Sequence, residues 1–333
     1  MKIDRIGVVG GGAWGTALAH IAAKAGAETL LWARDPTMVE AINRTHENQR
    51  YLPGTILDTR ITATDDLDLF RDADAILLVV PAQTVRALCR SLVSVVPTHC
   101  PIICCAKGLE TETGLLMTEV VGEVMPDHRL GCLSGPTFAT EAARGMPTAV
   151  TLAMEDQTRA AAIAGAIGTS TFRPYVSDDI VGAEVGGAIK NVLAIACGIA
   201  AGIGMGENTR AALITRGLAE ATRLAAALGG RRETMAGLAG LGDLAMTCAS
   251  RQSRNFRFGE ALGRNVPLET ILEEMGGVVE GRHTARATMK RASTLGIDLP
   301  ICQAVDEVLN KGTDLRQAIA GLMSRPLRAE MDC

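Results

Sequence analysis

The stretch Ile6-Gly7-Val8-Val9-Gly10-Gly11-Gly12-Ala13-Trp14-Gly15 places the pattern G-x-G-x-x-G directly after a short apolar run and at the start of a helical one. Gly10 permits a tight turn, Gly12 lets the backbone approach a pyrophosphate, and Gly15 allows close helix packing, while the helix N-terminus offers unpaired N–H groups to an anion. This context predicts a dinucleotide-binding turn. The alternative is a glycine-rich turn that binds nothing.

Short β-branched runs alternate with helical stretches through the first half of the chain, which is typical of βαβ units. Strand-like runs cover residues 6–9, 29–32, 75–80, 102–106, 130–133, 148–152 and 172–175. Helical stretches cover residues 14–25, 84–95 and 114–125, and Asp35-Pro36 supplies an N-cap followed by Pro at the first helical position. This alternation of strands and helices predicts an α/β fold with a doubly wound parallel sheet, which is a Rossmann domain.

Ala-rich helical patterns replace the strand-like runs after Asp178. We therefore expect a Rossmann domain over residues 1–178 and an all-helical substrate domain over residues 179–333. The segment 181–203 is apolar enough to suggest a membrane span, which takes about 20 residues. Glu184, Lys190 and Asn191 interrupt it, and the apolar run 192–203 is too short to span. A buried Gly/Ala-rich helix is expected instead, with no membrane span.

Composition narrows the class of protein. The 333 residues exceed what one hydrophobic core usually serves, and the net charge of −4 provides no broad basic field for nucleic acid. The nine cysteines are scattered without a paired C-x-x-C, so neither a disulfide framework nor a metal site is predicted. The N-terminus lacks a secretory cleavage pattern, and free thiols favour a reducing compartment, so a cytoplasmic protein is expected. A homodimer is expected only because homodimers are the most frequent oligomers of soluble proteins.

Arg34 and Asp35 follow the second predicted strand, where NAD-selective folds place a carboxylate for the ribose diol. The Arg34 guanidinium suits a 2′-phosphate, so NADP(H) is favoured, while Asp35 leaves NAD open. The alternative is that Arg34 is solvated and that Asp35 only caps the next helix.

Lys190 lies in the segment Gly186-Gly187-Ala188-Ile189-Lys190-Asn191, within the helix that is otherwise built to be buried. Because burying an ammonium group is costly and lowers its pKa, such a lysine is either paired or able to move protons. None of the five histidines has a comparable acid-base context. The structural alternative is a salt bridge, to Glu184 for instance.

Three further segments carry candidate ligand groups. The turn Gly240-Leu241-Gly242-Asp243 is followed by Ser253-Arg254-Asn255, which predicts a helix start able to hold a phosphate, although an ordinary solvated helix start fits as well. Lys107 and the segment Ser134-Gly135-Pro136-Thr137-Phe138 each follow a predicted strand, at the carboxyl edge where ligands of such sheets bind. A plain turn is an equally good interpretation of the second segment.

Seven blocks together resemble the bacterial NAD(P)-dependent glycerol-3-phosphate dehydrogenases: GGGAWGTALA, CCAKGLE, SGPTFA, GGAIKN, AALITRGLAE, GLAGLGDL and QSRNFRFG. The resemblance covers nearly the whole chain. It implies reduction of dihydroxyacetone phosphate to sn-glycerol 3-phosphate for glycerophospholipid synthesis, with Lys190 as the general acid-base residue.

The resemblance also implies contact residues. Those for the substrate are Lys107, Gly135, Thr137, Lys190, Asn191, Asp243, Thr247, Ser253, Arg254 and Asn255. Those for the cofactor are Ala13, Trp14, Arg34, Lys107, Ala139, Arg254, Val278 and Glu280, in addition to Gly10, Gly12 and Gly15 of the glycine motif. Two residues depart from the family pattern: Thr140 stands where Lys is common, and Asp58 where Pro is frequent.

Two other functions compete with this one. A hydroxyacid or ketopantoate-type dehydrogenase would share the Rossmann half and a helical lysine, but it has no need for the phosphate cradle at Ser253-Arg254-Asn255. A sensor that binds NADPH without catalysis would have no need for the buried Lys190.

Overall fold

The computed structural model describes residues 2–275, 279–327 and 329–330. The chain forms two compact units, which we call unit 1 (Met1–Ala106 and Met117–Ala183) and unit 2 (Lys107–Leu116 and Glu184–Cys333). The segment Lys107–Leu116 therefore belongs to the helical unit, although it is flanked on both sides by residues of unit 1. The predicted boundary at residue 178 gives each domain one continuous segment, so it does not describe the placement of Lys107–Leu116 in unit 2.

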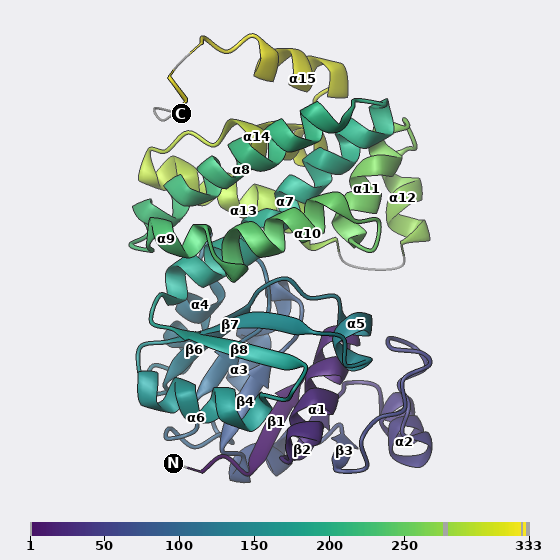
Figure 1. Ribbon diagram of the computed structural model, residues 1–333, viewed down its shortest axis with the longest axis vertical. Coiled ribbons are helices and arrows are strands. Elements are labelled where there is room, and N and C mark those ends of the chain that lie inside the picture. The colour runs from purple at the N-terminus through teal and green to yellow at the C-terminus, as the bar shows by residue number, and fades with distance from the viewer. Residues whose placement is uncertain (1, 276–278, 328, 331–333) are drawn as a thin grey trace. The chain divides into compact units, whose positions relative to one another are not determined.

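Unit 1 is built on one eight-stranded sheet (Figure 1). Its strands are β1 (Arg5–Val9), β2 (Glu28–Trp32), β3 (Ile61–Thr64), β4 (Ala75–Leu78), β5 (Ile102–Cys104), β6 (Leu130–Ser134), β7 (Thr148–Met154) and β8 (Phe172–Ser177). Its α-helices are α1 (Ala13–Ala25), α2 (Pro36–Thr45), α3 (Val85–Leu92), α4 (Met117–Val124), α5 (Ala139–Ala143) and α6 (Gln157–Ile167), and the 3-10 turns are η1 (Leu67–Asp72) and η2 (Ala82–Thr84).

The strand order β3-β2-β1-β4-β5-β6-β7-β8 contains the Rossmann order 3-2-1-4-5-6, which confirms the predicted fold class. Strands β1 to β6 are parallel. β7 pairs antiparallel with β6, and β8 pairs parallel with β7, so the last two strands run against the rest of the sheet. The sequence predicted no such reversal, nor the four-residue strand β3.

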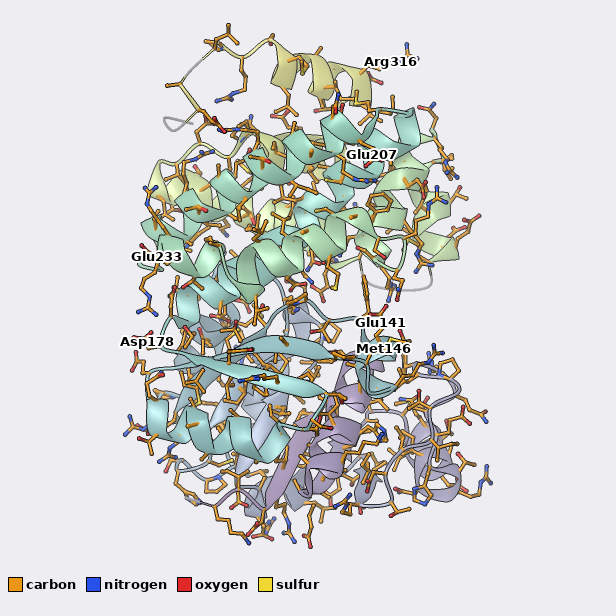
Figure 2. All side chains as sticks on the ribbon, viewed as in Figure 1. Glu141, Met146, Asp178, Glu207, Glu233 and Arg316 are labelled. Atoms are coloured by element: carbon orange, nitrogen blue, oxygen red, sulfur yellow. The ribbon has the colours of Figure 1, made fainter. Side chains whose placement is uncertain are left out.

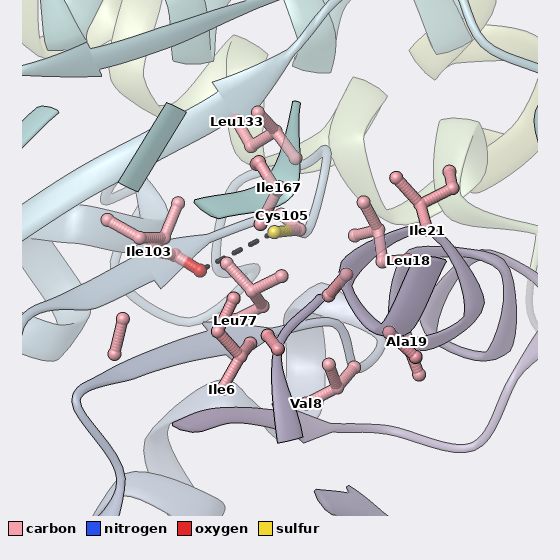
Figure 3. Packing of buried hydrophobic residues seen from close by; sticks show 14 of the residues in the cluster. Ile6, Val8, Leu18, Ala19, Ile21, Leu77, Ile103, Cys105, Leu133 and Ile167 are labelled. Atoms are coloured by element: carbon pink, nitrogen blue, oxygen red, sulfur yellow. Dashed lines mark hydrogen bonds between the residues drawn. The ribbon is translucent and has the colours of Figure 1, made fainter. Parts of the chain in front are cut away.

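Right-handed crossovers put the helices of unit 1 on both faces of the sheet, because α1 leads from β1 to one side and α3 leads from β4 to the other. α1 packs against both α5 and α6, and all three helices are labelled in Figure 1. Figure 3 shows the apolar cluster beneath them, in which Ile6, Val8 and Leu77 of the sheet meet Leu18 and Ile21 of α1. This burial on both faces explains why the strands read as continuous apolar runs.

Unit 2 is helical. Its α-helices are α7 (Ile180–Ile203), α8 (Glu207–Ala227), α9 (Arg232–Met235), α10 (Asp243–Ala249), α11 (Arg254–Gly263), α12 (Leu268–Glu274), α13 (Glu280–Leu295), α14 (Pro300–Lys311) and α15 (Leu315–Met323). One π-helical turn, η3 (Leu238–Gly242), precedes α10. Charged side chains such as Glu207, Glu233 and Arg316 project from these helices and are exposed (Figure 2).

The helix α7 is long and apolar enough to cross a membrane by length and composition, and 78% of its most apolar window is buried inside the protein. Helices that form the core of a domain share these properties, which agrees with the predicted buried helix. Among the described residues, no other helix meets the same criteria.

Glycines let α7 and α11 approach closely. A Cβ on Gly198 or Gly202 of α7 would collide with the backbone of α11 at Phe256 or Glu260. Conversely, a Cβ on Gly259 or Gly263 of α11 would collide with the backbone of α7. The four glycines thus set the distance between the helix that carries Lys190 and the helix that begins at Arg254.

Candidate active site and cofactor-binding loop

The glycine-rich loop of unit 1 has the geometry that the motif predicts. Gly10 has φ +132°, and a Cβ there would collide with the Val79 carbonyl, while a Cβ on Gly15 would collide with the Gly10 carbonyl. Gly12 faces open space, since no heavy atom lies within 4 Å of where its Cβ would be. The two outer glycines are therefore required by packing, and the middle one leaves room for a ligand.

The start of α1 suits a pyrophosphate. Gly12 is the N-cap of this 13-residue helix and provides no side chain to accept from the first-turn N–H groups. These amides and the positive end of the helix favour an anion. The buried indole Nε1 of Trp14 also has no hydrogen-bond partner among the described residues. The chain's own groups therefore fit a dinucleotide at this loop, beginning at the predicted residues Gly12, Ala13 and Trp14.

Charged side chains gather at the carboxyl end of β2. Arg34 is exposed. Asp35 caps α2, because its Oδ1 accepts from the Thr37 N–H at 3.0 Å and from the Thr37 hydroxyl at 2.7 Å. Its Oδ2 lies 3.3 Å from an Arg50 guanidinium nitrogen. Both carboxylate oxygens therefore already have partners, which disfavours Asp35 as the acceptor for a ribose diol.

In unit 2, Lys190 lies in a cluster with Lys107 and Asp243. The Lys190 ammonium donates to Asp243 Oδ1 and to the Thr247 hydroxyl at 3.2 Å. Lys107 donates to the other oxygen, Asp243 Oδ2, at 2.6 Å. The Asp243 side chain is fully buried and that of Lys190 is 8% exposed. One carboxylate thus holds two ammonium groups in place.

The pKa of Lys190 is lowered to about 8 from an ordinary value of 10.5. Burial is the main cause, because it removes water from the charged form, and the nearby Lys107 charge acts in the same direction. The Asp243 carboxylate opposes both effects. A lysine with this pKa can both donate and accept a proton near neutral pH, which a fully solvated lysine does poorly.

The turn before α10 explains how Asp243 reaches the cluster. η3 is a π-helical turn, a feature that is frequent at functional sites. A Cβ on Gly240 would collide with the Met235 carbonyl, and a Cβ on Gly186 of α7 would collide with the Ala239 carbonyl. These glycines allow the turn to pack against α7, so that α10 begins with Asp243 and places Thr247 one turn later on the same face.

A chain of amides connects the lysine cluster to the start of α11. Asn191 Nδ2 donates to the Lys107 carbonyl at 3.0 Å, and Asn255 Nδ2 donates to Asn191 Oδ1 at 2.9 Å. The Gly281 N–H donates to Asn255 Oδ1 at 3.1 Å. Asn191 and Asn255, predicted as substrate contacts, therefore also hold α7, α11, α13 and the Lys107 segment together.

The segment Ser253-Arg254-Asn255 forms a helix start, as predicted. Ser253 is the N-cap of α11, and its hydroxyl accepts from the Phe256 N–H at 3.2 Å. Arg254 is the first residue of α11 and is exposed, with one guanidinium nitrogen 3.3 Å from the Met275 carbonyl. Because Asn255 bonds Asn191, the neighbour of Lys190 in the sequence, this helix start lies near the lysine cluster.

The remaining predicted residues fall in both units. In unit 1, Gly135 has φ +141° after β6, the Thr137 hydroxyl donates to the Gly135 carbonyl at 3.2 Å, and Ala139 begins α5. In unit 2, Glu280 begins α13. Val278 lies outside the described residues. Contacts of all these residues with substrate or cofactor stay predictions.

Sequence reasoning missed two residues that shape these sites. Asn48 is buried, and its Nδ2 donates to the Gly11 carbonyl at 3.0 Å and to the Thr16 hydroxyl at 2.8 Å, which anchors the glycine-rich loop. Gly281 is needed because a Cβ there would lie 2.7 Å from the Asn191 carbonyl. The available signals were that Asn48 lies shortly before the turn residues Pro53 and Gly54, and that Gly281 directly follows Glu280, which the resemblance assigns to the cofactor.

No group of three or more His, Cys, Asp or Glu is placed to hold a metal ion in the part of the chain that the structure describes. The eight cysteines among the described residues are buried and free.

Residues 5–160 match the N-terminal part of the NAD-dependent glycerol-3-phosphate dehydrogenases, and residues 179–320 match their C-terminal part. A relative from Rhodospirillum rubrum, "Glycerol-3-phosphate dehydrogenase [NAD(P)+]", is 53% identical over 98% of this chain and 94% of its own. The crystal structure of glycerol-3-phosphate dehydrogenase from Coxiella burnetii is 36% identical, with a TM-score of 0.93 over 97% of this chain and 99% of that one.

A ketopantoate reductase from Ralstonia eutropha shares the fold alone, at 16% identity and a TM-score of 0.59 over 96% of this chain and 99% of that one. The two domain matches, by contrast, cover most of the chain, and the Rhodospirillum rubrum relative shares more than half of its residues. The chain therefore belongs to the family of NAD(P)-dependent glycerol-3-phosphate dehydrogenases.

Proposed function

We propose that this chain reduces dihydroxyacetone phosphate to sn-glycerol 3-phosphate, reversibly, and so supplies glycerol 3-phosphate for glycerophospholipid synthesis. The observation that carries the proposal is Lys190, a buried lysine with a pKa of about 8 that is held by Asp243 beside a polar helix start. A dehydrogenase of a phosphorylated ketone needs both features, a proton carrier and an anchor for the phosphate.

Lys190 acts as the general acid in reduction. A nicotinamide cofactor held by the glycine-rich loop would supply the hydride for C2 of the ketone. The Lys190 ammonium gives its proton to the C2 oxygen as negative charge develops there, and the neutral amine takes a proton back from the C2 hydroxyl in oxidation. Asp243 keeps the Lys190 side chain in place and favours its charged form.

Arg254 anchors the substrate phosphate. Its guanidinium can bind two phosphate oxygens, and the first-turn amides of α11 add N–H donors at the positive end of the helix. Lys107 adds a second positive charge to the cluster of unit 2. We propose that Gly135 and Thr137, at the carboxyl edge of the sheet, complete the substrate contacts.

The glycine-rich loop holds the cofactor, with contributions from Arg34, Ala139, Lys107, Arg254, Val278 and Glu280. NADP(H) is preferred over NAD(H), because Arg34 is exposed and Asp35 is already engaged by Thr37 and Arg50. We also propose that the enzyme works in the cytoplasm and is a homodimer, which light scattering coupled to size exclusion would test against the chain mass of 34.9 kDa.

The deciding experiment is an absorbance assay of NADPH oxidation with dihydroxyacetone phosphate, run beside unphosphorylated dihydroxyacetone and a non-phosphorylated 2-keto acid. Turnover of the phosphorylated ketone alone is expected. Preference for the 2-keto acid would instead support a hydroxyacid or ketopantoate-type dehydrogenase, and binding of NADPH without turnover of any of them would support a sensor.

A further inference from the structure

The segment between α2 and β3 is firmly attached to the glycine-rich loop. Besides the bonds from Asn48 to Gly11 and Thr16, the Tyr51 N–H donates to Asn48 Oδ1 at 3.2 Å, and the Leu52 N–H donates to the Asn48 carbonyl at 2.8 Å. Leu52 is fully buried and forms an apolar cluster with Trp14 and Ala17 of α1. Position 50, between these contacts, is therefore fixed relative to the loop.

The loop is in turn packed against the end of β2. A Cβ on Gly11 would lie 2.7 Å from the Ala33 Cβ and 2.9 Å from the Met38 Cε, so the glycine allows close contact with the residue before Arg34. The glycine-rich loop, Arg34-Asp35 and the segment around position 50 consequently lie next to one another within unit 1.

Arg50 faces Asp35 in this arrangement. Its guanidinium lies 3.3 Å from Asp35 Oδ2 and 5.2 Å from the centre of the Tyr51 ring, and 64% of the side chain is exposed. Contact with the carboxylate and with the ring holds an otherwise flexible side chain in place, yet leaves much of the guanidinium open to a ligand.

The charges at this site add up differently with and without Arg50. Arg34 and Asp35 alone sum to zero, and the Asp35 carboxylate would repel a phosphate dianion. With Arg50 the net charge is +1, and the carboxylate is paired with a cation. A 2′-phosphate is therefore attracted more strongly when both arginines are present.

We propose that Arg50 is a second determinant of NADP(H) specificity, which pairs with Asp35 and joins Arg34 in binding the 2′-phosphate of the cofactor. The inference rests on the proposed preference for NADP(H) and adds the residue that makes Asp35 compatible with it. NAD(H), which lacks the 2′-phosphate, gains little from Arg50.

The test is direct binding of NADP⁺ and NAD⁺ to the full-length protein by isothermal titration calorimetry, without substrate. Arg50→Gln is expected to weaken NADP⁺ binding about tenfold, as for loss of a charge-assisted contact, and to change NAD⁺ binding less than about twofold. Arg71→Gln is the matched control, because Arg71 is an arginine of unit 1 with 62% of its side chain exposed and an acidic partner, Asp68. It should leave both affinities unchanged.

Asp35→Asn in the Arg50→Gln background gives a second readout. Asn also caps helices, so α2 should be retained, and removal of the unpaired carboxylate should recover part of the lost NADP⁺ affinity. Equal losses for both cofactors, or no loss in Arg50→Gln, would overturn the role of Arg50. If Arg34→Ala alone reduces NADP⁺ affinity selectively, only the inference about Arg50 fails. If neither arginine matters, the preference for NADP(H) fails as well.

Discussion

At the scale of single residues, Lys190 can be separated from cofactor binding, because in our proposal it acts on the substrate oxygen and is not one of the cofactor contacts. Lys190→Met should lower kcat by about 100- to 10,000-fold, the usual contribution of a positioned acid or base, and should leave the Kd for NADPH nearly unchanged. Steady-state kinetics and calorimetry measure the two effects. A variant that keeps more than about a tenth of the wild-type kcat would remove Lys190 from this role.

The lowered pKa of Lys190 predicts a pH dependence with opposite sign in the two directions. Reduction needs the ammonium, so its rate should fall as the pH rises through about 8, whereas oxidation needs the amine and should rise over the same range. Asp243 favours the charged form of Lys190. Asp243→Asn should therefore move the midpoint of both profiles to lower pH, and an unchanged midpoint would show that another group titrates.

The substitution Arg254→Lys keeps the positive charge of the side chain but changes its geometry. Arg offers a planar fork to two phosphate oxygens, and Lys offers a single point of charge. Arg254→Lys should therefore raise KM for dihydroxyacetone phosphate and also lower kcat, because the phosphate orients the ketone. Unphosphorylated dihydroxyacetone, a poor substrate, should keep its kcat/KM. Equal damage to both substrates would mean that Arg254 supports the fold or the cofactor instead.

At the scale of elements, the crossing of α7 and α11 depends on glycine. Gly198→Ala should destabilise the protein by about 1 to 3 kcal/mol, the cost of overpacking, since its Cβ would meet the backbone of α11. Gly165→Ala is the control: this exposed glycine of α6 has no atom within 4 Å of its Cβ position, and the change should be neutral or stabilise by up to about 1 kcal/mol. Urea unfolding measures both. Similar effects of the two substitutions would contradict the packing argument.

Some strands and helices can be predicted from the sequence, and others cannot. The apolar run of β1 and the 13-residue helix α1 beside the glycine motif have clear sequence signals, and both are predicted to within one residue. β3 has only four residues, with Thr at two of them, so its pattern is too short to recognise. The reversal at β7 has no local signal, because an antiparallel and a parallel strand buried on both faces have the same apolar pattern.

At the scale of the whole molecule, the segment Lys107–Leu116 should unfold with unit 2 and not with the residues of unit 1 that flank it. It is held there by Lys107 on Asp243, by the Asn191 amide and by Lys290, which donates to the Glu112 carbonyl. Native-state hydrogen exchange can follow the Glu110 and Gly114 amides, both of which are hydrogen bonded.

Gly198→Ala, which weakens unit 2, should accelerate exchange of these two amides together with those of α7, while the amides of β1 and β4 keep their protection. If the Glu110 and Gly114 amides instead keep the protection of β1 and β4, the segment belongs energetically to unit 1.

The amino-acid sequence alone was sufficient for the Rossmann domain and the helical second half, and it named candidate site residues from Gly10 to Glu280 whose ligand contacts stay predictions. Local signals carry these features: the glycine spacing, the strand and helix periods, and a lysine within an apolar helix. Only the tertiary structure decided which side chains these residues pair with. Asp243 bonds Lys190 across 53 residues, and Arg50 pairs with Asp35 across 15. Such pairs form because packing brings distant segments together, and neither side chain carries a local sign of the other.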